Sequence, residues 1–596
     1  MGNTVSFPFG RNLETSSGGR LATAIYVSVV FFAIYKLFIA KLWGSSNTNK
    51  ALVAKNTRSR NYRFDVIRKY ISQLDKSLAE EIVSLDFNTL REKLQDGSIT
   101  AEQALLAYWR KALIVHDDLN CLMDVVLMAY DEALDLDTDY PKGSQKPPLF
   151  GIPFSVKGNF YMKDYYCSLG LTKFLDQPKT SECSMVSYLR SQGAIPFVIT
   201  NVPQALLSFV CSNPIYGTTG NPHNKDRTPG GSSGGEAALV AAGGAPFGIG
   251  SDLAGSLRIP AVMCGIISLK PTEGRLVVTN THGGVPGRGR LGLSYGFFTR
   301  TVEDQVFLLD NILSSDKYVQ MARKTAPIPF RHHLFTEEKK LKIGYFVDDG
   351  FLKPVPCCAR AVTETIEKLK HAGHEVVLFR IPDPVKVAGM FYKNLMPDGG
   401  SYINGLFSND LVDQYMTKFV MLLKIPFVVR YLASILLAPF SPQFALLSRS
   451  YVSGLSDQRK NQEMTDDYFE QFTKEWTDNN LDALICPGFP VPSVPHKYPS
   501  DLGACAFSTG LFNMLDYVAG VVPTGQVTSD DDITLLDPTK WPVGHNMVYQ
   551  KMRDAAKSSV GLPIGVQIIT PPFTEEKCLT LMKEVEAAWM ANPQNE

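Results

Sequence analysis

The sequence lacks several features that mark secreted, metal-binding or nucleic-acid-binding proteins. It has no Asn-x-Ser/Thr glycosylation site, and its ten cysteines are scattered, with Cys357-Cys358 as the one close pair. No CxxC motif or Cys/His cluster has the spacing of a metal site, so we expect neither a metal nor a cofactor. Lys plus Arg and Asp plus Glu number 59 each, which gives no electrostatic reason to expect a nucleic-acid partner. These absences fit the reducing environment of the cytosol.

Long hydrophobic runs are scarce too, and the clearest one lies near the N-terminus. Residues 21–40 are mostly apolar, carry Lys36 as their only charge, and are long enough to span a bilayer. Lys and Arg are more numerous after this run than before it, which places the main body of the chain in the cytoplasm. A buried core helix is the alternative. Residues 1–6 also fit a myristoylation pattern, which conflicts with one spanning helix because it would keep the N-terminus cytosolic.

Composition divides the chain into three parts. Residues 1–43 hold the predicted transmembrane helix, residues 44–60 form a polar linker, and residues 61–596 form the folded domain. The periodicity of residues 61–115 is helical, and the run that starts at Thr100 matches a capping box.

Short apolar runs alternate with helical patterns along most of this domain. Such alternation predicts an α/β sandwich, in which a mixed sheet lies between layers of helices. The expected strands are 149–156, 194–200, 246–250, 341–347, 375–379, 481–486 and 562–569, and the expected helices include 185–192 and 362–372.

The segment 411–445 interrupts this pattern. It places Lys418, Lys424 and Arg430 among Phe, Leu, Ile and Val, and its prolines divide it into pieces too short to span a membrane. A basic, aromatic-rich helical pair of this kind is typical of segments that insert into the interface of one leaflet. A buried helical hairpin and a dimer interface are the alternatives, since basic amphipathic segments also bind partners.

Two hydroxyl-rich turns dominate the stretch 227–275. A Gly-Ser loop at 230–235 leads into a small-residue helix, and an apolar strand then leads to a second turn at 252–256. Because one helix and one strand separate the two turns, we expect them side by side at one edge of a sheet. Glycine has no Cβ, so the backbone N–H groups of such turns can approach a ligand closely.

These turns, together with an upstream run, resemble the amidase signature family of Ser-Ser-Lys amide hydrolases. The matching runs are Gly230-Gly231-Ser232-Ser233-Gly234-Gly235, Gly250-Ser251-Asp252, Gly255-Ser256, Leu269-Lys270-Pro271-Thr272 and Gly151-Ile152-Pro153-Phe154-Ser155-Val156-Lys157. The resemblance implies an α/β amidase-signature fold, a twisted mixed sheet sandwiched by helices, which follows the N-terminal transmembrane helix.

The resemblance also implies a role for each matching residue. Ser256 would be the nucleophile, Ser232 the bridging serine and Lys157 the base. A lysine is a base only when neutral, which requires burial or a nearby charge to lower its pKa. The Gly231–Ser232 peptide bond would be cis. The oxyanion hole would consist of the backbone N–H groups of Leu253, Ala254, Gly255 and Ser256.

Three residues near the expected nucleophile carry further expectations. Asp252 and Arg258 flank the turn, and we interpret them as a structural ion pair rather than as catalytic groups. Ala254 stands where the family usually has glycine, so we expect Ala254 to adopt a conformation that glycine would reach more easily.

Two other motifs in the sequence favour competing interpretations. Residues 231–235 also satisfy G-x-S-x-G, with Ser233 as the central serine and His496 or His545 as a possible partner. A nucleophile elbow follows a strand directly, whereas Thr228-Pro229 precedes this loop. A phosphate-binding P-loop is disfavoured because no Gly-Lys-Ser/Thr follows the glycines.

The predicted anchor and the segment 411–445 distinguish this chain from soluble amidases. The combination is similar to membrane-anchored fatty-acid amide hydrolases. That resemblance implies a homodimer on an endomembrane such as the endoplasmic reticulum, with its catalytic domain in the cytoplasm. It also implies an acyl channel near the nucleophile, with Ser232 among the substrate contacts. The residues that would line the channel are Leu206, Leu207, Ser208 and Phe209.

We therefore expect a membrane-bound serine hydrolase that cleaves fatty-acid amides, such as N-acylethanolamines and primary fatty amides, to a fatty acid and an amine. Its partners would be the lipid amide and membrane lipids. One alternative is a membrane amidase or esterase for other small amides or lipid esters, and another is a catalytically inactive lipid-binding homologue. An aminotransfer subunit acting on charged tRNA has the same signature, but zero net charge and the absence of a basic tail disfavour it.

Overall fold

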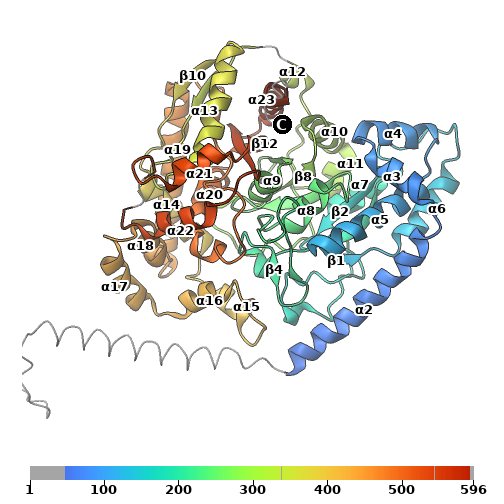
Figure 1. Ribbon diagram of the computed structural model, residues 1–596, viewed down its shortest axis with the longest axis horizontal. Coiled ribbons are helices and arrows are strands. Elements are labelled where there is room, and N and C mark those ends of the chain that lie inside the picture. The colour runs from blue at the N-terminus through green and yellow to red at the C-terminus, as the bar shows by residue number, and fades with distance from the viewer. Residues whose placement is uncertain (1–46, 337–338, 542–543, 591–596) are drawn as a thin grey trace, which may run out of the picture.

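The computed structural model describes residues 47–336, 339–541 and 544–590. The predicted transmembrane helix at 21–40 lies outside the described residues. In Figure 1 a sheet runs through the middle of the molecule with helices around it, and α2 crosses one side as a long blue rod. The expected α/β sandwich with a mixed sheet is confirmed.

The sheet has eleven strands in the described part of the chain, in the order β1-β3-β2-β6-β8-β7-β12-β13-β11-β9-β10. β2 pairs in parallel with β3 and β6, and β9 pairs in parallel with β10 and β11, whereas the remaining pairs are antiparallel. The strands are β1 (Leu122–Val125), β2 (Pro153–Lys157), β3 (Ile195–Thr200), β6 (Gly248–Asp252), β7 (Ile267–Lys270), β8 (Ser294–Thr299), β9 (Lys342–Tyr345), β10 (Glu375–Leu378), β11 (Ala483–Pro487), β12 (Val518–Gln526) and β13 (Pro563–Thr570), with β4 (Ser212–Asn213) and β5 (Gly217–Thr218) as a separate pair.

Helices cover both faces of this sheet. As a result, six of its strands are buried along their whole length, namely β2, β3, β6, β7, β8 and β11. The helices are α2 (Asn47–Ile71), α3 (Lys76–Ser84), α4 (Phe87–Asp96), α5 (Ala101–Leu119), α6 (Ala129–Asp139), α7 (Ser184–Ser191), α8 (Gly234–Ala241), α9 (Arg258–Cys264), α10 (Val302–Leu313), α11 (Asp316–Met321), α12 (His332–Phe335), α13 (Pro356–His371), α14 (Pro384–Leu395), α15 (Ser401–Phe407), α16 (Thr417–Lys424), α17 (Phe427–Leu437), α18 (Pro442–Arg449), α19 (Leu455–Asp478), α20 (Phe507–Met514), α21 (Ser529–Leu536), α22 (Met547–Ala556) and α23 (Glu575–Met590).

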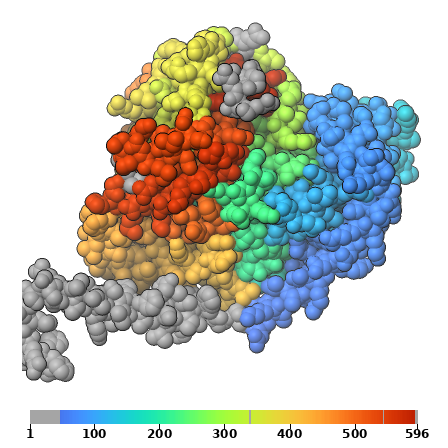
Figure 2. Space-filling model, in the orientation of Figure 1, coloured from blue at the N-terminus to red at the C-terminus, as the bar shows by residue number. Residues whose placement is uncertain are grey.

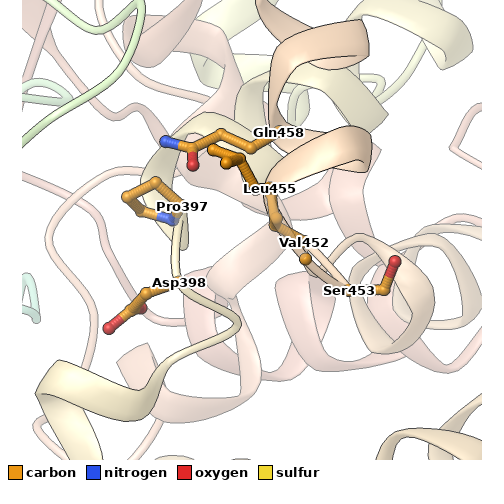
Figure 3. A pocket seen from close by; sticks show the side chains of 7 residues that line it. Pro397, Asp398, Val452, Ser453, Leu455 and Gln458 are labelled. Atoms are coloured by element: carbon orange, nitrogen blue, oxygen red, sulfur yellow. The ribbon is translucent and has the colours of Figure 1, made fainter.

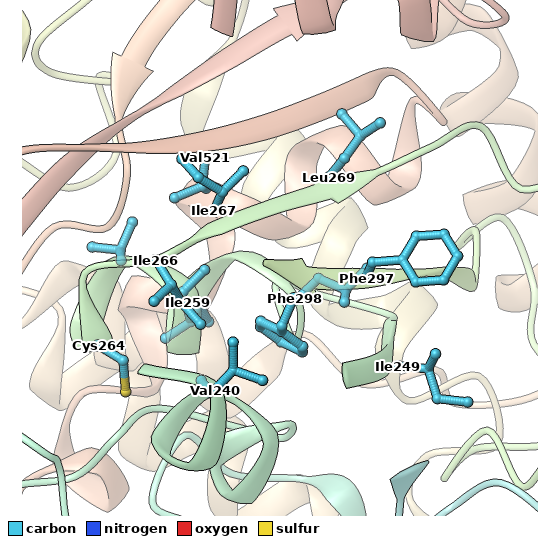
Figure 4. Close-up of a cluster of buried hydrophobic side chains, with 14 of the residues drawn as sticks. Val240, Ile249, Ile259, Cys264, Ile266, Ile267, Leu269, Phe297, Phe298 and Val521 are labelled. Carbon is cyan, nitrogen blue, oxygen red and sulfur yellow. The ribbon is translucent and has the colours of Figure 1, made fainter. Parts of the chain in front are cut away.

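The core beneath the candidate turns is apolar and closely packed. Figure 4 shows Val240 of α8 and Ile259 of α9 facing Phe298 of β8 and Ile267 of β7. All four side chains are buried. Burying a large apolar side chain stabilises the folded state by roughly 1.5–3 kcal/mol. This layer therefore fixes α8 and α9, the two helices that follow the hydroxyl-rich loops.

The prediction of a polar linker at 44–60 is wrong for residues 47–60, because these residues belong to α2. This run contains no proline or glycine, and its Ala, Lys and Arg residues favour a helix. α2 packs against α5 and β1, with Phe64 and Ile67 buried. An ion pair between Lys55 and Asp176, at 2.9 Å, also ties its first half to the domain. The polar composition thus marks the exposed side of a docked helix.

Other local expectations are confirmed or need small changes. Thr100 and Gln103 form the expected capping box at the start of α5. The strand expected from residue 149 begins only at Pro153, because the chain turns at Gly151, whose φ is +71°. The segment 411–445 forms α16, α17 and the start of α18, which Pro426 and Pro442 separate.

Candidate active site

Two parallel strands bring the candidate residues to one edge of the sheet. β2 and β6 are paired with Ser155 opposite Gly248, so their carboxyl ends meet at the same edge. Lys157 is the last residue of β2, and Ser256 follows β6 in the turn before α9. The loop that contains Ser232 precedes α8, which packs on both strands. The two hydroxyl-rich turns therefore lie side by side, as expected.

Lys157 is fully buried and bonded to serines of both turns. Its Nζ donates to Ser232 Oγ at 2.9 Å, to Ser251 Oγ at 2.9 Å and to the Ser251 carbonyl oxygen at 3.2 Å. Ser232 itself is buried, and the Gly231–Ser232 peptide bond is cis, as the resemblance implied. The structure thus joins two of the three expected catalytic side chains directly.

The environment of Lys157 favours the neutral amine. Burial lowers the pKa of Lys157 to about 7 from its ordinary value of 10.5, while the nearby Asp252 carboxylate opposes this shift by attracting the charged form. A substantial fraction of the side chain is therefore neutral near pH 7, in the form that can accept a proton.

Asp252, the nearest acidic residue on β6, is committed to other partners. It forms the expected ion pair with Arg258, with Nε and Oδ2 3.0 Å apart and both side chains fully buried. Burial alone would raise the pKa of Asp252, but Arg258 and Asn513 lower it below its ordinary range. The Asp252 carboxylate also accepts from the backbone N–H groups of Gly255 and Leu257, so the ion pair holds the turn in place.

Two further polar residues at this edge had no role in the sequence interpretation. Ser251 provides two of the three hydrogen bonds to Lys157. Glu236 lies beneath the lysine and accepts from Ser155 Oγ and, at 2.7 Å, from Thr200 Oγ1. Burial raises the pKa of Glu236 to about 8, so its carboxyl is largely protonated at pH 7. Both residues lie within the stretch 227–275. The pairing of β6 with β2 brings Ser251 to Lys157, and the packing of α8 on both strands brings Glu236 close.

The turn at 252–256 departs from expectation at two residues. The Gly255 N–H donates to Asp252 Oδ1 at 2.7 Å, so it is not a free oxyanion donor in this structure. The N–H groups of Leu253, Ala254 and Ser256 donate to no protein group in the described part of the chain. The strained conformation also falls on Gly255, at φ +113°, and Ala254 is absent from the described residues with positive φ. Glycine is therefore required one position later than we expected.

Ser256 is partly exposed and faces a large pocket of about 810 Å³. Within the described residues its hydroxyl makes no hydrogen bond, so it is not joined to Ser232 here. Catalytic hydrogen bonds are commonly loose without substrate and tighten in the substrate complex. The expected channel residues Leu206, Leu207, Ser208 and Phe209 line the same pocket, together with Leu253, Ala254 and Gly231.

The far walls of this pocket come from later parts of the chain. They consist of segments within 392–451, 499–506 and 547–551, and most of the lining is apolar. In Figure 2 the residues coloured orange, which include α16 and α17, form the lower left part of the molecule, below the red residues of α21 and α22. The segment 411–445 thus contributes walls to the pocket that Ser256 faces.

The competing sites have less support. Ser233 Oγ donates to the Ser251 carbonyl oxygen at 3.4 Å, His496 contacts the Lys225 carbonyl oxygen, and His545 is exposed. Among the described residues, no Ser-His pair forms at the Gly-Ser loop. A smaller pocket of about 230 Å³, shown in Figure 3, is lined by residues that include Asp398, Ser453 and Gln458. The Asp398 side chain there accepts from backbone N–H groups of its own loop, which is a structural role.

Comparison with known proteins agrees with this geometry. The model of the amidase family matches residues 103–579. The chain belongs to the amidase family. It is accordingly a hydrolase of carbon–nitrogen amide bonds.

Two relatives of this amidase are animal proteins. The chain is 34% identical to fatty acid amide hydrolase 1 of Caenorhabditis elegans over 527 residues, covering 87% of this chain and 91% of that protein. It is 33% identical to fatty-acid amide hydrolase 1 of Sus scrofa, covering 85% and 86% of the two chains. A solved structure of a fatty acid amide hydrolase superposes with a TM-score of 0.72 at 22% identity, covering 90% of each chain. The similarity to this solved structure shows that the two chains share a fold.

The lowered pKa of Lys157 predicts a stability difference that depends on pH. Between about pH 7 and pH 10.5 the unfolded chain binds one proton more than the folded chain at this residue, so the stability of the wild type rises with pH. The substitution Lys157→Met removes the titrating amine and with it this contribution to the pH dependence of stability. The unfolding temperature of the wild type relative to Lys157→Met should therefore increase across that window and stay constant below it. Lys551→Met, which removes an exposed lysine, is the matched control. A pH-independent difference would contradict the assignment.

Proposed function

We propose that this amidase cleaves fatty-acid amides to a fatty acid and an amine. The observation that carries the proposal is the position of Ser256 and its turn on a large, mostly apolar pocket. A pocket of this kind suits a long hydrocarbon chain, because each buried methylene contributes roughly 0.8 kcal/mol. The named relatives, which are fatty acid amide hydrolases, support the same substrate class.

The proposed mechanism begins with proton transfer through the two serines. Neutral Lys157 accepts the proton of Ser232, Ser232 accepts that of Ser256, and Ser256 Oγ attacks the amide carbonyl carbon. The free N–H groups of the turn at 253–256 stabilise the negative charge that develops on the carbonyl oxygen. Ser232 then returns a proton to the departing amine, and water hydrolyses the acyl-enzyme along the reverse path. This is a Ser-Lys form of triad chemistry, which needs no histidine.

We also propose that α16 and α17 attach the enzyme to a membrane. Leu436 is 76% exposed and Val428 and Leu432 are more than half exposed, so α17 presents an apolar outer face. No single described helix is long and apolar enough to cross a bilayer, whereas α16 and α17 together pass that test but are bent by 111°. Such a bent, apolar pair suits insertion into one leaflet. A dimer interface on the same face is the competing proposal, because an exposed apolar patch also suits a second copy.

The substrate class is tested by hydrolysis of a panel of acyl amides of increasing chain length. The ratio kcat/KM should increase with chain length in the wild type, and Ser256→Ala should abolish both turnover and covalent labelling by a fluorophosphonate. Ser232→Ala should retain slow turnover, because water can partly replace a proton relay. Full labelling of Ser256→Ala, or a preference for acetamide over long-chain amides, would show that the proposal is wrong.

The role of Lys157 is tested with a matched amide and ester. Lys157→Ala should slow acylation severely, and by a larger factor for the amide, because the amine must be protonated to leave whereas an alcohol leaves more easily. The remaining activity should rise with pH as hydroxide replaces the base. Acylation rates of both substrates between pH 6 and pH 10 are the measurement. Equal losses with an unchanged pH profile would remove Lys157 from the proton path.

Membrane attachment is tested with protein that lacks residues 1–43. This truncated enzyme should still sediment with liposomes, and the substitutions Leu432→Glu and Leu436→Glu together should release it. Ile533→Glu changes an equally exposed apolar residue on α21 and should leave sedimentation unchanged. Release from liposomes by the control, or no release by the α17 pair, contradicts attachment through α17. Loss of a dimer in the α17 pair, without loss of sedimentation, would favour the dimer interface.

A further inference from the structure

One peptide unit of the turn before Ser256 is held at both of its polar ends. The Ala254 carbonyl oxygen accepts from Thr509 Oγ1 at 2.7 Å. The Gly255 N–H group, which belongs to the same peptide unit, donates to Asp252 Oδ1 at 2.7 Å. A peptide unit is planar, so its orientation is fixed once both ends are bound. The N–H groups of Ala254 and Ser256 belong to the two neighbouring units, and a rotation of the central unit would move both of them.

The Thr509 hydroxyl is committed to this contact. Thr509 is fully buried in the first turn of α20, and its branched side chain has few rotamers. Its hydroxyl has one proton, and the Ala506 carbonyl oxygen of the same helix is the more distant acceptor, at 3.3 Å. A Cβ on Gly255 would lie 2.3 Å from Thr509 Oγ1. The hydroxyl therefore reaches the Ala254 carbonyl oxygen only because glycine stands at position 255.

The same face of α20 holds the other side of the turn through Asn513. Asn513 lies one helical turn after Thr509, and its Nδ2 donates to the Asp252 carbonyl oxygen at 3.1 Å and to Asp252 Oδ1 at 2.9 Å. Its Oδ1 accepts from Arg258 Nη2 at 2.6 Å. These contacts fix Asp252 but do not reach the next carbonyl group. In the described part of the chain, Thr509 is the one donor to the Ala254 carbonyl oxygen.

We propose that Thr509 is a positioning residue for the oxyanion hole, and that its hydroxyl holds the turn at 253–256 so that the N–H groups of this turn meet the substrate's carbonyl oxygen. The proposal rests on the proposed function, in which Ser256 attacks an amide. Negative charge reaches the carbonyl oxygen only as the bond from Ser256 Oγ to the carbonyl carbon forms and the π electrons of the carbonyl move to its oxygen. Donors oriented in advance for that charge lower the barrier without tightening the binding of substrate.

The test measures oleamide hydrolysis by the full chain carrying Thr509→Val, in which a methyl group replaces the hydroxyl. Loss of an oxyanion donor outright lowers kcat by about 10²–10³-fold. Thr509→Val keeps the donors but releases the turn, so kcat should decrease by at least about tenfold while KM changes by less than about twofold. Thr509→Ser keeps the hydroxyl and should keep most of the wild-type kcat. An unchanged kcat in Thr509→Val, or a loss expressed in KM alone, overturns the proposal.

A matched control removes a buried hydroxyl elsewhere. Thr524 on β12 is as fully buried as Thr509, but its hydroxyl has no hydrogen-bond partner within the described residues. Thr524→Val should therefore have the kcat and KM of the wild type, and a loss equal to that of Thr509→Val overturns the proposal. If Thr509→Val does not fold, Thr509→Ser and Thr509→Ala decide, because they differ by the hydroxyl alone. Equal kcat values in these two variants overturn the proposal.

A transition-state analogue separates an effect on the oxyanion from a general effect on the pocket. Ser256 Oγ adds to the carbonyl carbon of oleoyl trifluoromethyl ketone, and the oxygen of the adduct carries the charge that the oxyanion hole stabilises. Its Ki should increase by at least about tenfold in Thr509→Val, whereas the Ki of oleyl alcohol, which has no carbonyl group, should stay the same. Equal increases for both inhibitors overturn the proposal.

Failure of this proposal is distinguishable from failure of the proposed function. A wild type that hydrolyses oleamide, together with a Thr509→Val variant of equal kcat, rejects the role of Thr509 and leaves the proposed function in place. A wild type that neither hydrolyses oleamide nor is labelled at Ser256 by a fluorophosphonate rejects the proposed function, and the role of Thr509 with it.

Discussion

The site depends on one constraint, which is that Lys157 is buried without a carboxylate as its hydrogen-bond partner. Its three bonds go to two hydroxyls and a carbonyl oxygen. Two carboxyl groups lie close enough to influence it, but both are engaged elsewhere. Asp252 is paired with Arg258, and Glu236 accepts from Ser155 and Thr200 while burial raises its pKa. An ion pair with either would hold the lysine charged, whereas this arrangement leaves burial as the dominant effect on its pKa.

Two glycines near the site allow neighbouring protein atoms to pack closely against the backbone, in addition to allowing a ligand to approach it. A Cβ on Gly248 would lie 1.9 Å from Glu236 Oε2, so this position leaves the space that the Glu236 carboxyl fills. A Cβ on Gly231 would lie 2.5 Å from the Ser208 carbonyl oxygen. Because Ser208 lines the pocket, that contact ties the Ser232 loop to the pocket wall. Proton transfer and substrate binding are thus built on the same close backbone approach.

The sequence could predict which side chains lie together at this edge of the sheet, because the quoted motifs stand at the ends of the strands β2 and β6. Lys157 was expected at the exit of an apolar strand, and burial along β2 explains its lowered pKa. The role of Ser251 was missed, since an alternating strand sequence does not show which neighbour a side chain meets across the sheet. The sequence also predicted a free N–H group at Gly255, which is wrong. This N–H group donates to the Asp252 side chain, and no repeating pattern in the sequence reveals such a contact. The linker at 44–60 was wrong because an exposed helix and a flexible segment share a polar composition.

The segment 411–445 shows how one amphipathic helix can serve two surroundings. The outer side of α17 presents Val428, Leu432 and Leu436 to solvent, where an apolar face is unfavourable unless lipid or a partner covers it. Its inner side holds Arg430, which is buried and lies over the ring of Tyr451. The usual order, with apolar residues inside and charge outside, is therefore inverted in this helix. An apolar outer face is stable when the surroundings of that face are a hydrocarbon phase. The exposed apolar face of α17 therefore supports the proposal that this helix attaches the enzyme to a membrane.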